Sequence, residues 1–177
     1  KIFQQMWNNY GRVLAEYMFM KKFRNDQLSQ NIVVEGSEIL EKIKKENQTV
    51  VFISGHFSNF ELMAMQIEKV GINVAAVYRP LNNIFLNSIM EKIRKTHICK
   101  KQIKKGIGGV KELLKLTKEG YSTAVMIDQR VSQGIKTNFF NEKAFTTTIP
   151  AQLVKKFNSP VVPLFIERLD GIKFKII

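Results

Sequence analysis

Short apolar runs alternate with helical stripes along most of this chain. Strand-like apolar runs occupy residues 50–53, 73–78, 122–127 and 161–166, with shorter candidates at 31–35, 137–140 and 172–177. Apolar residues three or four positions apart predict helices at 37–45, 58–70, 83–95, 110–118 and 150–157. Strands that alternate with helices favour a parallel sheet covered on both faces. The pattern therefore predicts an α/β fold, a three-layer sandwich with a mainly parallel central sheet flanked by helices.

The first 23 residues predict an amphipathic helix whose apolar stripe is rich in aromatic residues and methionine. Such a stripe packs on a core or docks on a membrane surface, and the sequence leaves both readings open. In the helix predicted at 83–95, the same pattern places the charged side chains outward, Arg94 among them.

Composition adds a strong positive charge to this picture. The 177 residues are 45% hydrophobic, enough for one domain with its own core, which we take as residues 1–177. Lys and Arg number 28 against 15 Asp and Glu, a net charge of +13, which implies an acidic partner such as nucleic acid, anionic lipid or an acidic carrier. Seven lysines between residues 100 and 118 form the densest positive region, either a solvated face or a docking patch.

Several site types find little support in the sequence. Two histidines and the single Cys99 do not make a zinc site of the usual ligands, so we expect no metal. The glycines at 106–109 follow no nucleotide-binding pattern. No apolar run approaches the roughly 18 residues of a membrane span. Because the chain starts without Met and ends in a strand-like run, we expect a fragment that lacks an N-terminal membrane anchor and the C-terminal end.

The most informative stretch is VVFISGHFSNFEL, residues 50–62. A buried strand ends at Gly55, His56 follows, and Glu61 lies five positions later at the start of a helix. One short turn can bring that carboxylate onto the imidazole, fix its tautomer and stabilise its cation. We therefore predict His56 as a general base oriented by Glu61, an effect worth roughly 10²-fold to 10⁴-fold in rate.

Polar residues also follow the other central strands. Arg79 comes after the strand 73–78, and Asp128 and Arg130 come after 122–127. Parallel strands end at one edge of a sheet, so these residues are candidate substrate-binding groups, together with Asn59. Arg79 could hold a phosphate or carboxylate, or form a surface ion pair. Asp128 could cap a loop, accept a hydrogen bond from substrate, or brace an arginine.

With these residues in view, the sequence resembles a known family. GHFSNFE is similar to the GHFGNWE-type block of the late lipid A biosynthesis acyltransferases, and VYRPLNN, IDQR, AFTTTIPAQL and SPVVPLF follow in the family's order. Ser58 and Phe60 depart from the usual Gly and Trp. The resemblance implies a glycerolipid acyltransferase-like fold and transfer of a fatty acyl chain from an acyl carrier protein or coenzyme A thioester to a hydroxyl of a lipid A precursor.

The resemblance further implies His56 as the base, Glu61 as its partner, and no cofactor. The partners would be the thioester donor, an anionic glycolipid acceptor and the cytoplasmic face of the bacterial inner membrane, where the protein would be peripheral or anchored by a segment outside this chain. The alternatives are an acyltransferase for glycerol phosphate or another glycolipid, in which Asp is more usual than Glu61, and a non-catalytic basic lipid-binding protein. A nucleic-acid-binding module fits the charge but leaves the His-Glu spacing unexplained.

Overall fold

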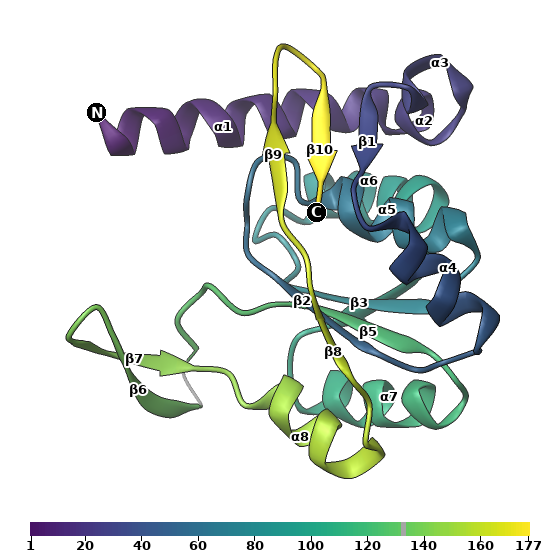
Figure 1. The fold of residues 1–177 in the computed structure, drawn as a ribbon. Coiled ribbons are helices and arrows are strands. Elements are labelled where there is room, and N and C mark those ends of the chain that lie inside the picture. The colour runs from purple at the N-terminus through teal and green to yellow at the C-terminus, as the bar shows by residue number, and fades with distance from the viewer. Residues whose placement is uncertain (132–133) are drawn as a thin grey trace.

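Five parallel strands form the central sheet of the computed structural model, which describes residues 1–131 and 134–177 (Figure 1). Their spatial order is β4–β3–β5–β2–β8, and every pair of neighbours is parallel. The strands are β2 (Val51–Ser54), β3 (Val74–Tyr78), β4 (Lys101–Lys104), β5 (Ser122–Met126) and β8 (Val161–Pro163). With helices on both faces, the sheet confirms the predicted α/β sandwich.

Alternate residues of the strands build a core on each face of the sheet. On one face, Phe52 and Val74 pack in a cluster with Leu62 and Met65 of α5 (Glu61–Val70). That side also holds α4 (Ser37–Lys45) and α6 (Ile84–Ile93), which continues into the π-helix η2 (Arg94–Ile98). On the other face, Val51 and Ala75 pack with apolar residues of α7 (Ile107–Lys118) and α8 (Ile149–Phe157). Figure 1 shows α7 and α8 on the side of the sheet opposite α4, α5 and α6.

The N-terminal segment lies across the α5 side of the domain. It comprises α1 (Ile2–Glu16), the 3₁₀ turn η1 (Tyr17–Phe19), α2 (Met20–Arg24) and α3 (Asp26–Ser29). A second sheet joins it to the end of the chain, in the order β1 (Ile32–Val34), β10 (Phe174–Ile176) and β9 (Ile166–Arg168). Among the described residues, no helix combines the length and the apolar content that a membrane span requires.

Two elements differ from the sequence prediction, and a third is confirmed with different bounds. The basic stretch at 101–104 is the edge strand β4, in which Ile103 is buried while Lys101 and Lys104 face solvent. The run 161–166 divides between the two sheets, because β8 ends at Pro163 and the chain crosses before β9. The extended segment predicted at 137–140 belongs to a hairpin of β6 (Ile135–Phe139) and β7 (Glu142–Thr146).

Candidate active site

The pairing of β2 with β5 brings His56 and Asp128 together. Ser54 lies opposite Met126 in this parallel ladder, so the residues two positions beyond each strand end are also neighbours. The His56 backbone N–H donates to Asp128 Oδ2 at 2.7 Å, and His56 Nδ1 lies 2.8 Å from Asp128 Oδ1. The His56 side chain is 20% exposed, so the pair is reachable from solvent.

This contact determines what the imidazole can do. A carboxylate accepts hydrogen bonds, so Nδ1 carries the proton and Nε2 presents a lone pair when His56 is neutral. If Nε2 takes up a proton, the Asp128 carboxylate stabilises the resulting cation. The arrangement is that of a general base held in one tautomer.

The residues on either side of His56 fix its position. A Cβ at Gly55 would lie 2.8 Å from the Phe57 ring and 3.0 Å from Asp128 Oδ2, so only glycine allows this close approach. The Phe60 ring packs edge-on against the imidazole, with 4.8 Å between centroids. We call residues 55–60 the His56 loop.

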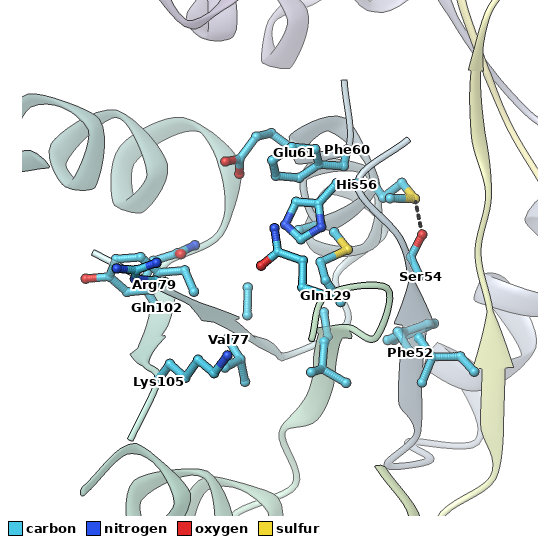
Figure 2. Close-up of a pocket in the computed structure, with 18 of the residues that line it drawn as sticks. Phe52, Ser54, His56, Phe60, Glu61, Val77, Arg79, Gln102, Lys105 and Gln129 are labelled. Atoms are coloured by element: carbon cyan, nitrogen blue, oxygen red, sulfur yellow. Dashed lines mark hydrogen bonds between the residues drawn. The ribbon is translucent and has the colours of Figure 1, made fainter. Parts of the chain in front are cut away.

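Glu61 does not contact His56 in the part of the chain that the structure describes. Its Oε1 accepts hydrogen bonds from Tyr17 Oη and from Arg94 Nε and Nη2, the last two at 2.9 and 2.6 Å. Figure 2 shows the Glu61 side chain turned away from the imidazole. The predicted pairing is therefore replaced by His56–Asp128. The physical reason is burial: Glu61 is 7% exposed, and a buried carboxylate needs a cation, which Arg94 supplies.

Arg94 is the site residue that the sequence analysis missed. The sequence pattern predicts an outward side chain, but the apolar stripe of α6 that includes Ile84 and Ile89 faces solvent, whereas Arg94 lies one helical turn after the buried Met90 and is 8% exposed. Burial is the largest single effect and opposes the charge of Arg94, but the interactions with Glu61 and Tyr17 together outweigh it and raise the pKa of Arg94. Burial and the Glu61 charge raise the pKa of Tyr17, so its hydroxyl stays protonated and donates to Glu61. Arg94 Nη1 has no hydrogen-bond partner among the described residues.

The same register logic places two cations at the next strand ends. Tyr78 of β3 lies opposite Lys104 of β4, so Arg79 and Lys105 follow at adjacent positions, and Lys105 N donates to Tyr78 O at 2.8 Å. Both are exposed and line the cavity described below, and within residues 1–131 and 134–177 neither forms an ion pair. We call them the cationic pair. Arg130 lies apart from them, with its guanidinium 5.7 Å from the Phe145 ring.

Asn59 is not placed to bind substrate as predicted. It is fully buried, and its Nδ2 donates to Glu16 Oε2 at 2.7 Å. A loop side chain three residues after His56 is easily read as part of the site, but the N-terminal helix covers this one. Its contact joins the His56 loop to α1.

A cavity of about 380 Å³ opens between the His56–Asp128 pair and the cationic pair (Figure 2). His56, Arg79, Gln102, Lys105 and Gln129 form its polar part. Its apolar part lies between the sheet and α5, where Ala76, Ala124 and Phe52 are neighbours in one row of the sheet and Ala64 faces them from the helix. The small alanine side chains leave the space that a larger residue would fill. Among the described residues, no group of three His, Cys, Asp or Glu side chains could hold a metal ion.

Comparison with known proteins gives two matches. A family model described as "Bacterial lipid A biosynthesis acyltransferase" matches residues 1–177. The chain is also 22% identical, over 142 residues, to "Lipid A biosynthesis acyltransferase 2" of Shigella flexneri. That alignment covers 79% of this chain and 45% of the relative, so the chain spans about half the length of the Shigella protein.

The buried Glu61–Arg94 pair gives a stability prediction. Arg94→Met leaves the Glu61 carboxylate buried without a cation, and we expect the free energy of unfolding at neutral pH to fall by about 3–5 kcal/mol. Arg94→Met combined with Glu61→Gln should recover most of this loss, because the buried charge is gone. Urea unfolding followed by circular dichroism measures both. Arg24→Met, which breaks the more exposed pair of Arg24 with Glu68, is the control and should cost less. Equal losses for both single variants would contradict the burial argument.

Proposed function

Since the family model spans the whole chain, the protein belongs to the bacterial lipid A biosynthesis acyltransferase family, and from this premise we propose that it transfers a fatty acyl chain from an acyl carrier protein or coenzyme A thioester to a hydroxyl of a lipid A precursor. The observation that carries the proposal is the His56–Asp128 pair beside a cavity with one cationic and one apolar part.

The proposed reaction is a direct transfer with His56 as general base. The acceptor hydroxyl gives its proton to Nε2 of His56 while its oxygen attacks the thioester carbonyl carbon. The tetrahedral intermediate collapses as the C–S bond breaks, and the imidazolium returns the proton to the departing thiolate. The products are an ester and a free thiol, so the balance needs no metal or redox cofactor, and we propose none.

The developing oxyanion needs hydrogen-bond donors. In the described part of the chain, the backbone N–H groups of residues 57–60 donate no hydrogen bond, and they lie directly after the base. Arg94 Nη1 is a further donor at the cavity wall, and it has no hydrogen-bond partner within residues 1–131 and 134–177. We propose that these groups stabilise the oxyanion, with Glu61 acting through Arg94, whose guanidinium it holds in place.

The cationic pair suits an anionic substrate. Arg79 can hold a phosphate through two parallel hydrogen bonds, and Lys105 adds a second charge beside it. We propose that they bind the charged group of the glycolipid acceptor, with Arg130 further from the cavity centre. The acyl chain of the donor would then lie in the apolar part, along the alanines.

We also propose that the protein works at the cytoplasmic face of the inner membrane. Three segments next to the carboxyl edge of the sheet expose large apolar side chains, which water solvates poorly. They are the first half of α1, the start of α6 and the tip of the β6–β7 hairpin, with Trp7, Phe85 and Phe140 exposed by 67%, 81% and 88%. In Figure 1 the N-terminal end of α1 and the hairpin project on the same side of the domain. The net charge of +13 would favour anionic lipid.

In the first test, the full-length protein is incubated with acyl thioesters of acyl carrier protein or of coenzyme A. The acceptors are lipid A precursors that bear or lack Kdo. We expect ester formation, and a loss of about 10²-fold or more in kcat for both His56→Ala and Asp128→Asn in folded protein. Turnover near that of the parent in either variant would remove the mechanism. Transfer only to glycerol phosphate or another glycolipid would replace the acceptor, and lipid binding without transfer would replace the enzyme by a lipid-binding protein.

The apolar part of the cavity predicts a chain-length effect. Ala124→Leu fills space between the sheet and α5, so kcat/KM for the longest accepted acyl chain should fall by about tenfold or more relative to shorter chains. Competition between donor thioesters of different lengths measures the ratio. Ala151→Leu, the same change at an exposed position of α8, should leave the profile as it was. An unchanged profile in folded Ala124→Leu would place the acyl chain elsewhere.

Co-sedimentation with lipid vesicles tests the membrane surface. Replacing Ile84 and Phe85 by Ser should lower binding to vesicles that contain anionic phospholipid several-fold, because both side chains are more than three-quarters exposed and would insert. Ile39→Ser, at a half-exposed position of α4, is the matched control. Equal binding by the double variant and the control would assign the membrane contact to another surface.

A further inference from the structure

One side of the N-terminal segment holds the His56 loop and the start of α5 through three successive polar contacts. Asn9 Nδ2 donates to the backbone carbonyl of Ser58 at 3.1 Å, Glu16 accepts from Asn59, and Tyr17 donates to Glu61. Asn9 and Glu16 are seven residues apart, which is two turns of helix, so both face the loop.

The middle contact is buried and involves three side chains. Glu16 is 7% exposed, and its carboxylate also receives Arg168 Nη1 at 2.6 Å and Nη2 at 3.2 Å from β9. Asn59 is fully buried, and its Oδ1 has no hydrogen-bond partner among the described residues. The bond to Glu16 is therefore what fixes the Asn59 amide. Through it, the loop, α1 and the second sheet meet at one carboxylate.

The loop needs such a contact because its backbone is strained. Ser58 has φ +43°, a left-handed conformation that a residue with a Cβ adopts at a cost of about 1 kcal/mol or more. Its first end is tied to Asp128 through His56. Without a second attachment, the residues between His56 and Glu61 could relax to an ordinary conformation.

We propose that Glu16 and Asn59 are positioning residues, which hold the His56 loop in the conformation that aims His56 and the backbone N–H groups of residues 57–60 at the reacting carbonyl. This inference rests on the proposed acyl transfer for its effect on rate. The attachment itself can be measured without any activity.

Asn59→Asp tests the proposal by placing an acceptor where the donor to Glu16 stood. Two facing carboxylates repel, so amide hydrogen exchange over residues 56–62 should become at least tenfold faster. A displaced loop misaligns His56 with the reacting carbonyl in the transition state. We therefore expect kcat to fall by about tenfold to 10²-fold with little change in KM. Glu16→Gln combined with Asn59→Asp restores one amide and one carboxylate, and it should recover most of both losses.

Two further variants keep the test decisive. Glu68→Gln breaks the Arg24–Glu68 pair away from the loop, so it should lower stability while kcat and exchange over 56–62 stay at the parent's values. If Asn59→Asp fails to fold, Asn9→Ala removes the contact to Ser58 from a half-buried position and should raise the same exchange rates.

Unchanged exchange in a folded Asn59→Asp, or in Asn9→Ala, would overturn the attachment. Faster exchange with unchanged kcat would overturn the positioning role. A parent without transfer activity would refute the proposed function and leave the exchange result valid.

Discussion

The parallel pairing of β2 with β5 is the constraint on which the site depends. His56 and Asp128 are 72 residues apart, and they meet because each stands two positions beyond a paired strand end. A shift of one residue in this register would move one of them by about 3.3 Å and exchange the two faces of its strand. Both strands lie inside the sheet with core packed on each face, which excludes such a shift. The packing of the core therefore fixes the geometry of the His56–Asp128 pair.

One buried and one partly buried ion pair flank the His56 loop. Glu16 is held by Arg168, and Glu61 by Arg94, so each carboxylate is bound to a distant part of the chain. Burying charged groups is costly in itself, and a hydrophobic pair would fill the same space at least as stably. The ion pairs restrict orientation, because a carboxylate oxygen can reach the guanidinium only from a few positions of the helix that carries it. Glu16 fixes the end of α1 and Glu61 the start of α5, and the loop lies between them.

The sequence predicts the fold well and the site only in part, for one physical reason. Strands such as 73–78 and helices such as 37–45 follow from local periodicity, and the structure has both. The partner of His56 does not follow from local periodicity, because it depends on which strands are neighbours. β2 pairs with β5 rather than with the strand that follows it in the chain. Proximity along the chain favours Glu61, whereas spatial register selects Asp128. Arg94 was missed because the apolar stripe of α6, predicted as the inner face, is exposed at Ile84 and Ile89, and the buried face carries Met90 and Arg94 instead.

The departure from the family pattern at Ser58 fits the contacts of α1. The family block usually carries Gly at this position, and glycine adopts left-handed backbone without strain. Ser58 adopts it at φ +43°, so in this chain the loop conformation needs stabilisation from outside the loop. Asn9 bonds the carbonyl of Ser58 itself, and Glu16 bonds the next side chain. The helix therefore provides, through tertiary contacts, the conformation that a glycine would adopt by its own preference, and the candidate site rests on α1 as well as on the sheet edge.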